Sequence, residues 1–207
     1  MENPRSAGIC LNHGATLAAV ALGANLSSWA GLPADTLRAA LIRMNEEGLS
    51  VSRVSRFWRT PAHPAGSGPD YVNAAALVET GETPPDAVLA TLHRIEAAFG
   101  RTRDGGRWQA RGLDLDLLAL GDLVRPDAAT QDRWRALAPQ DQARLAPDRL
   151  ILPHPRLADR GFVLAPLAEI APGWTHPRTG GTVASMLSRL RDDPSGRDAL
   201  DAMAPFA

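Results

Sequence analysis

The sequence predicts an α+β domain with a ferredoxin-like βαββαβ core, in which helices pack on one face of an antiparallel sheet and extra helices follow at the C-terminal end. Two observations predict this class. Short apolar segments typical of strands alternate with longer segments of helical periodicity, and their order is strand-helix-strand-strand-helix-strand. A chain of 207 residues, 44% of them hydrophobic, is long enough for one such domain with one insertion.

Hydrophobic spacing and the residues that end each run define the elements of this core. The run 16–22 is apolar and precedes a glycine turn, which is typical of a buried strand. In the segment 83–99, apolar residues recur at helical spacing and Gly100 follows, so we expect a helix with Thr83 as its cap. By the same criteria we expect strands at 16–22, 49–58, 71–79 and 113–120, and helices at 33–47, 83–99, 162–170 and 183–191.

The remaining segments define the expected domain organisation. Residues 1–15 show neither pattern and are expected to form a disordered N-terminal extension. A single domain is expected over 16–191. Residues 122–147 are polar and interrupt the pattern, so we expect a surface insertion there, and 192–207 is expected to be a C-terminal tail.

Composition excludes several classes of function. The net charge of −1 argues against a broad surface for nucleic acid or membrane, and no apolar run approaches the roughly 20 residues of a membrane helix. All 22 basic residues are arginine, and because a Walker-type phosphate loop requires lysine, that route to ATP binding is excluded. Cys10 is the only cysteine, which fits a reducing, cytoplasmic location.

The strongest local signal is a pair of carboxylates on the expected strand 113–120. Side chains alternate between the faces of a strand, so Asp114 and Asp116 share one face while the leucines beside them pack on the other. The two carboxylates start about 7 Å apart along the strand, which suits a pair of Mg²⁺ ions bridged by phosphate oxygens. An edge strand with a solvated acidic face would give the same pattern, so the two aspartates alone do not establish a metal site.

An arginine-rich loop comes directly before this strand. Arg101, Arg103, Arg107 and Arg111 are interleaved with glycines and Trp108. Arginine offers paired donors to phosphate oxygens and stays charged, which phosphoryl transfer requires. A solvated surface loop is the alternative, but an indole is better suited to covering a flat ligand.

Other polar residues are weaker candidates. His93 and Glu96 are one helical turn apart, and an exposed pair on a polar helix face explains them equally well. Tyr71 and Asn73 share one face of a strand and could bind a heterocycle or simply begin the strand. His154, between two prolines, is either a site residue or a turn histidine.

Short motifs containing these residues occur in a fixed order along the chain. They are ALGANL (21–26), SRFWRTP (55–61), PDYVNAA (69–75), RIE (94–96), GRTR (100–103), RWQARGLDLD (107–116), PHPR (153–156) and RGFVLAPL (160–167). This series resembles the 6-hydroxymethyl-7,8-dihydropterin pyrophosphokinase family from about residue 16 to about residue 177, apart from 122–147. The block 107–116 is its most specific part.

The resemblance implies an enzyme of folate biosynthesis that transfers pyrophosphate from ATP to 6-hydroxymethyl-7,8-dihydropterin and releases AMP. It implies ATP as co-substrate, two Mg²⁺ ions, no nucleic-acid or membrane partner, and a cytoplasmic monomer. The implied catalytic residues are Arg101, Arg111, Asp114 and Asp116, with Asp114 and Asp116 as the metal ligands. The implied ATP-binding residues are His93, Glu96, Arg103, Arg107, Arg111, Leu117, His154 and Arg160. The implied pterin-binding residues are Thr60, Pro61, His63, Tyr71, Asn73, Trp108 and Phe162.

Two other functions remain open on the sequence alone. A two-metal nucleotidyltransferase also uses strand carboxylates, but it would pair them with a Gly-Ser helix start, and Gly23-Ala24 lacks the serine. A non-catalytic ferredoxin-like domain would bind a ligand without turnover and would not need the arginine loop. The products formed from ATP distinguish the three.

Overall fold

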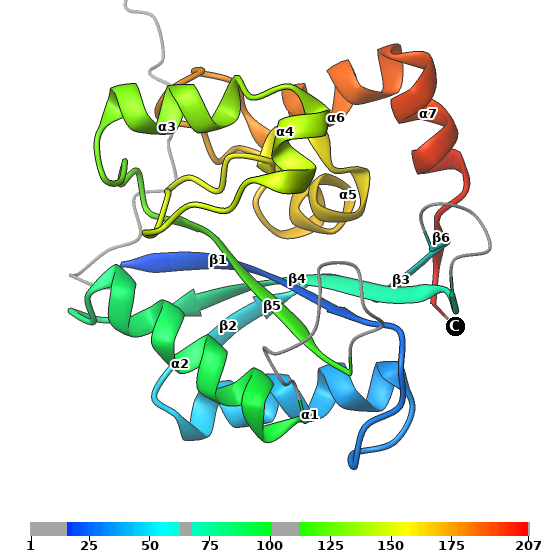
Figure 1. Cartoon of the computed structure of the whole chain (residues 1–207). Helices are drawn as coiled ribbons and strands as arrows, with labels where there is room; N and C mark the ends of the chain where they lie inside the picture. The colour runs from blue at the N-terminus through cyan, green and yellow to red at the C-terminus, as the bar shows by residue number, and fades with distance from the viewer. Residues whose placement is uncertain (1–15, 63–67, 101–111, 207) are drawn as a thin grey trace, which may run out of the picture.

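The fold is a six-stranded antiparallel sheet between two layers of helices, seen in the computed structural model of Figure 1, which describes residues 16–62, 68–100 and 112–206. The strands are β1 (Leu17–Ala24), β2 (Ser50–Val54), β3 (Trp58–Thr60), β4 (Tyr71–Glu79), β5 (Asp114–Leu120) and β6 (Ala204–Pro205). The helices are α1 (Pro33–Glu46), α2 (Pro85–Ala98), α3 (Ala128–Arg135), α4 (Pro139–Arg144), α5 (Gly161–Ile170), α6 (Val183–Asp192) and α7 (Pro194–Asp201), with a 3₁₀ turn at Leu157–Asp159. None of these described helices combines the length and apolar character that a membrane crossing requires.

The sheet has the strand order β5-β1-β4-β3-β6, and β2 also pairs with β4. β1 and β4 lie at its centre and pair from Leu17 opposite Glu79 to Ala24 opposite Val72. β5 pairs with the other side of β1, so it is an edge strand. One row of this register brings Asn73, Gly23 and Asp114 side by side across three strands.

Helices cover both faces of the sheet, which corrects the expectation that they pack on one face. α1 and α2 pack on the first face, where Leu37 and Leu92 join Leu115 in one core. α5 and α6 pack on the second face, where Leu164 joins Leu118 in another core. Both faces are covered because the central strands, β1 and β4, are apolar at almost every position and therefore need helices on each face of the sheet.

The expected core elements are present, with two local corrections. The strand expected at 49–58 is divided into β2 and β3, because Ser55 bonds to Ala75 between them through both its backbone and its side chain. α2 begins at Pro85 after the cap residue Pro84, and no side chain caps it, so the expected cap at Thr83 was wrong. Proline at the start of a helix needs no N–H partner, which explains this start.

Both segments outside the expected core contain regular structure. Residues 122–147 contain α3 and α4, and residues 192–207 contain α7 and β6. β6 extends the sheet by pairing with β3, so the domain continues past residue 191. The extension expected at 1–15 lies outside the described residues.

Candidate active site

The two carboxylates of β5 share the face of the sheet that α5 and α6 cover. Asp114 lies opposite Gly23 and Asp116 opposite Ala21, so the neighbouring strand presents only small side chains beside them. Leu115 and Leu117 point to the other face and are buried in the core, as the strand periodicity predicts. Both carboxylates are half-buried, which leaves them accessible to a ligand.

Arg160 connects the carboxylate pair to α5. Its Nη1 atom lies 3.5 Å from Oδ2 of Asp116, and its guanidinium lies 5.5 Å from the centre of the Phe162 ring. Phe162 is 40% exposed, so part of its ring is accessible to a flat ligand. Residues expected to bind metal, nucleotide and pterin therefore meet at the start of α5.

The outer edge of β5 is covered by residues expected to bind ATP. Glu96, only 1% exposed, accepts a 2.8 Å hydrogen bond from the backbone N–H of Leu115 through Oε1. Leu118 has no partner in the pairing of β5 with β1, as in a β-bulge. The Leu118 carbonyl accepts a 2.7 Å hydrogen bond from the backbone N–H of His154. Leu117 lies between these contacts, but its side chain is in the core, so only its backbone is available to a nucleotide.

The imidazole of His154 is held neutral. Burial of the ring, followed by the positive charges of Arg160 and Arg156, lowers its pKa to about 3, although the carboxylate of Asp114 opposes the shift. Nδ1 accepts a 3.1 Å hydrogen bond from the backbone N–H of Arg156, so in this network the proton is on Nε2. His154 can therefore offer a neutral donor to a phosphate or base, but not a positive charge.

The residues expected to bind the pterin line the end of β3 and β4. Asn73 is 6% exposed, and its Nδ2 donates a 2.6 Å hydrogen bond to Oγ1 of Thr60. Tyr71 lies opposite Thr60 in the register, and Pro61 follows in an exposed position. This arrangement fixes the Asn73 amide beside the row that leads to Asp114.

Gly23 leaves space for the Asn73 side chain. A Cβ atom at position 23 would lie 2.8 Å from Oδ1 of Asn73, closer than such contacts occur. The sequence analysis ended the first strand before Gly23, although a glycine within an apolar run often marks such a close approach. Gly23 therefore joins the candidate site residues, although the sequence pattern alone does not single it out.

Replacing Gly23 with alanine is expected to raise KM for the pterin about tenfold, because the new methyl group displaces the Asn73 amide. Steady-state kinetics with varied pterin measures this. The matched control is Gly173→Ala, where a Cβ atom meets nothing within 4 Å. An unchanged KM in Gly23→Ala would show that Asn73 does not contact the pterin.

Several expected site residues cannot be placed. His63, Arg101, Arg103, Arg107, Trp108 and Arg111 lie outside the described residues. His93 is half-buried on α2, one turn before Glu96, on the approach to the outer edge of β5.

The donors present fit Mg²⁺ better than a metal that needs a complete protein cage. Within 16–62, 68–100 and 112–206, no group of three or more His, Cys, Asp or Glu side chains is arranged to hold an ion. Mg²⁺ is commonly bound by one or two carboxylates, with phosphate oxygens and waters completing its coordination. Asp114 and Asp116 supply that number on one face.

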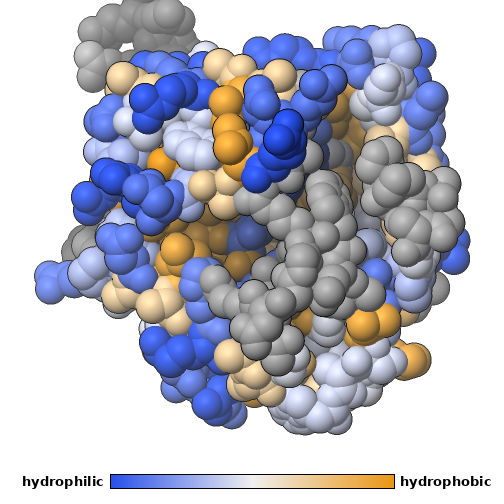
Figure 2. Space-filling view, viewed as in Figure 1, coloured by the Kyte–Doolittle hydropathy of each residue, from blue (hydrophilic) through white to orange (hydrophobic). Residues whose placement is uncertain are grey.

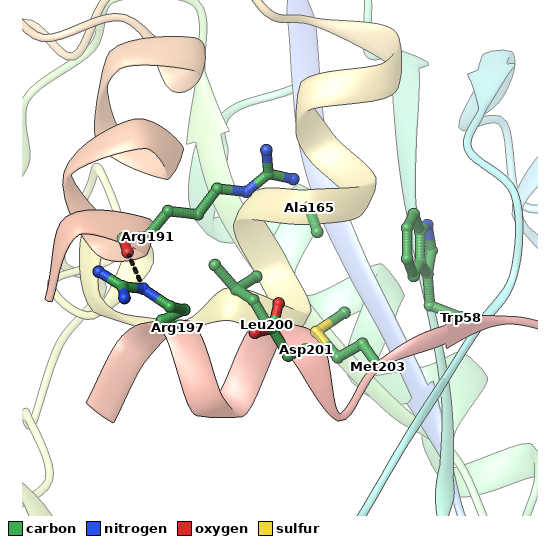
Figure 3. A pocket seen from close by; sticks show the side chains of 7 residues that line it. All are labelled: Trp58, Ala165, Arg191, Arg197, Leu200, Asp201 and Met203. Carbon is green, nitrogen blue, oxygen red and sulfur yellow. Dashed lines mark hydrogen bonds between the residues drawn. The ribbon is translucent and has the colours of Figure 1, made fainter. Parts of the chain in front are cut away.

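The surface of the domain is recessed in more than one place. Figure 2 shows apolar residues in a hollow between the upper helical layer and the sheet. A separate hollow of about 330 Å³ lies between β3, α5 and α7, lined by Trp58, Ala165, Arg191, Arg197, Leu200, Asp201 and Met203 (Figure 3). No expected site residue lines that second hollow.

Known proteins resemble this chain over most of its length. The family described as 7,8-dihydro-6-hydroxymethylpterin-pyrophosphokinase (HPPK) matches residues 19–172. The 2-amino-4-hydroxy-6-hydroxymethyldihydropteridine pyrophosphokinase of Synechocystis sp. is 35% identical over 179 residues, which cover 86% of this chain and 76% of that protein. The protein of the same name from Methylorubrum extorquens is 32% identical over 186 residues, which cover 90% of this chain and 99% of that protein.

A solved structure shows the same fold. The wild-type HPPK-DHPS of Plasmodium falciparum superimposes with a TM-score of 0.62 at 13% identity, over 92% of this chain. This chain spans 44% of that longer protein.

Proposed function

Because this chain belongs to the 7,8-dihydro-6-hydroxymethylpterin-pyrophosphokinase family, it is an ATP-dependent diphosphotransferase of folate biosynthesis. We propose that its reaction uses two Mg²⁺ ions and that Asp114 and Asp116 hold them. The enzyme transfers pyrophosphate from ATP to hydroxymethyldihydropterin, and AMP is the other product.

One observation carries the assignment: the row Asn73–Gly23–Asp114 across the sheet. It puts the residue expected to bind the pterin and the residue expected to bind the metal on one face, with only a glycine hydrogen between them. A pterin bonded to Asn73 and stacked on Phe162 would direct its hydroxymethyl group along this row toward Asp114.

The nucleotide is proposed to lie along the outer edge of β5. His154 would donate its Nε2–H to the nucleotide, while Arg160 would neutralise phosphate charge near Asp116. His93, Glu96 and the backbone of Leu117 border the same edge. Glu96 acts there mainly on the strand, since its carboxylate binds the Leu115 N–H.

The arginine loop completes the proposal by resemblance to the family. Arg101 and Arg111 are proposed to stabilise the transferring group. Arg103 and Arg107 are proposed to bind the triphosphate, and Trp108 and His63 to complete the pterin slot. Arginine suits these roles because its guanidinium keeps its charge and bonds two phosphate oxygens at once.

The chemistry is an in-line displacement at the β-phosphorus. The pterin hydroxymethyl oxygen forms the new bond to phosphorus, the bond to the oxygen of AMP breaks, and the hydroxyl proton is released. Mg²⁺ supplies charge neutralisation for the phosphates. The protein residues orient the alcohol and the phosphate chain and exclude water, and this positioning accounts for most of the acceleration.

The fold description, the domain organisation, the location and the oligomeric state are proposed from the sequence and the fold together. The core strands follow the βαββαβ order along the chain, with strand order β5-β1-β4 and β2 and β3 on β4, which supports the ferredoxin-like description. We propose one pyrophosphokinase domain that includes the 122–147 segment, acting as a cytoplasmic monomer without nucleic-acid or membrane partners. The single cysteine and the net charge of −1 support this.

The test is to incubate the protein with ATP, Mg²⁺ and hydroxymethyldihydropterin and to identify the nucleotide product. AMP that forms only when the pterin is present is expected, and chelation of Mg²⁺ should abolish it. Release of free pyrophosphate with a nucleotidylated product would instead show a nucleotidyltransferase. Binding of both ligands without any product would show a non-catalytic domain.

A further inference from the structure

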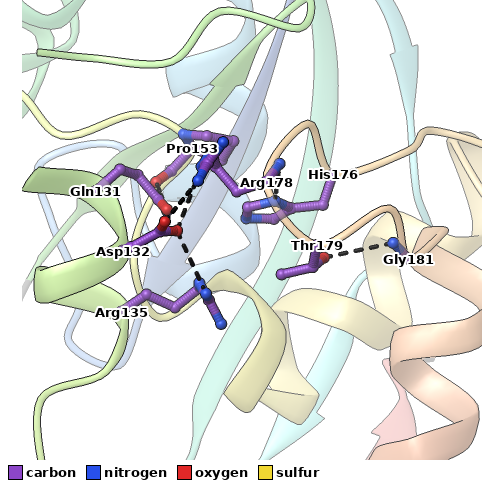
Figure 4. Close-up of polar contacts among 8 residues, drawn as sticks. All are labelled: Gln131, Asp132, Arg135, Pro153, His176, Arg178, Thr179 and Gly181. Atoms are coloured by element: carbon purple, nitrogen blue, oxygen red, sulfur yellow. Dashed lines mark hydrogen bonds and ion pairs between the residues drawn. The ribbon is translucent and has the colours of Figure 1, made fainter. Parts of the chain in front are cut away.

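Helix α3 belongs to the 122–147 segment, yet it contacts the turn that carries His154. Gln131 of α3 is fully buried, and its Nε2 donates a 3.1 Å hydrogen bond to the carbonyl of Pro153 (Figure 4). A polar side chain is rarely buried this completely unless it is hydrogen-bonded, and this bond to Pro153 is the one that Gln131 makes through its amide nitrogen. Pro153 directly precedes His154, so this bond acts on the peptide that orients the histidine.

The same turn is bonded on three sides. Arg125, ahead of α3, exchanges backbone hydrogen bonds of 2.9 and 3.2 Å with Leu152. The next residue, Pro153, is bonded to Gln131, and His154 donates its N–H to the Leu118 carbonyl of β5. Two of these three contacts come from the 122–147 segment, and only one comes from the core sheet.

α3 is itself anchored from both ends. Asp127 caps its first turn by accepting a 2.8 Å bond from the Thr130 N–H. On its other side, Asp132 binds Arg178 at 2.6 and 3.3 Å, and Arg135 also contacts Asp132 (Figure 4). A helix fixed in this way can hold the Pro153 carbonyl in one position.

We propose that Gln131 is a positioning residue for the nucleotide site, which acts by fixing the Pro153–His154 peptide and so the direction of the His154 imidazole. The inference rests on the proposed role of His154 in binding ATP. It assigns a function to a segment that the sequence alone indicates to be a surface insertion.

The test variant is Gln131→Met, which keeps the volume of the side chain but cannot donate to Pro153. We expect KM for ATP to rise about tenfold, while kcat and KM for the pterin change less than about twofold. The control is Gln142→Met, in α4 of the same segment, which removes a 2.8 Å bond to the Leu137 carbonyl but not the bond to Pro153, and it should leave KM for ATP unchanged.

A double-mutant cycle with His154→Ala separates this inference from the proposed function. If Gln131 acts through His154, Gln131→Met should add no further loss in the His154→Ala background. Additive losses would overturn the inference while leaving the role of His154 intact. If His154→Ala alone leaves KM for ATP unchanged, the inference fails together with that assignment, although pterin-dependent AMP formation can still stand.

A second variant covers the case in which Gln131→Met does not fold. Asp127→Ala removes the exposed cap of α3 without altering the buried side chain. It should produce a smaller increase in KM for ATP with the pterin KM unchanged. An ATP KM that equals that of the unmodified protein in this folded variant would overturn the proposal.

Discussion

Replacing Asp116 with asparagine is expected to lower kcat for AMP formation by about 10²–10³-fold or more. Asparagine keeps the shape of the side chain but removes the charge that would hold Mg²⁺ against the phosphates. The same loss is expected for Asp114→Asn, because both residues lie on one face of β5 and are proposed to hold the Mg²⁺ ions together. Single-turnover measurements with saturating ATP and pterin would record the change in the chemical step.

Stability distinguishes this loss from unfolding. Both carboxylates are half-buried at the surface of the site, so the free energy of unfolding should change by about 1 kcal/mol or less. Asp122→Asn, in the exposed turn after the same strand, is the matched control and should be fully active. Normal turnover of either test variant at ordinary Mg²⁺ concentrations would refute the metal assignment.

Replacing Glu96 with alanine is expected to lower the free energy of unfolding by about 1–3 kcal/mol and to reduce turnover as well. Alanine leaves the buried N–H of Leu115 without the 2.8 Å bond that it now makes. That N–H lies between the two aspartates, so the loss also loosens the segment that carries them. Urea unfolding and AMP formation would measure the two effects.

Glu96→Gln is the informative comparison for this prediction. Its amide oxygen can still accept the bond from Leu115, so it should retain most of the stability that alanine loses. Equal destabilisation by glutamine and alanine would mean that the negative charge of Glu96, rather than this hydrogen bond, stabilises the strand.

Hydrophobic periodicity predicts the core strands and helices well, because each of these elements is determined by residues that are close together in the sequence. β4 spans the expected 71–79, since its long apolar run is bounded by polar residues. The expected alternation of Asp114, Leu115 and Asp116 is also confirmed by their burial. Such features follow from the geometry of one strand and need no knowledge of its neighbours.

Features that depend on distant contacts could not be predicted in this way. The pairing of β6 with β3 joins residues about 145 positions apart, and two residues of moderate hydrophobicity give no local signal for it. The burial of Gln131 likewise depends on its contact with Pro153, which is distant in the sequence. From the sequence alone, a glutamine in a polar segment is expected to be exposed to solvent. The order of strands and helices does not show on which face each helix packs, whereas the nearly continuous apolar runs of β1 and β4 indicate that both faces are covered.

With Asn73 on the pterin and Asp114 on the metal, as proposed, the row Asn73–Gly23–Asp114 would also limit which alcohols the enzyme can diphosphorylate. Adjacent strands lie about 4.8 Å apart, so the backbones that carry Asn73 and Asp114 are separated by roughly 10 Å. Sheet hydrogen bonds make that separation rigid. A pterin with a longer alcohol arm would carry its oxygen past the phosphorus, and a shorter arm would not reach it. On this proposal, the spacing of three adjacent strands would select the substrate by the length of its alcohol arm.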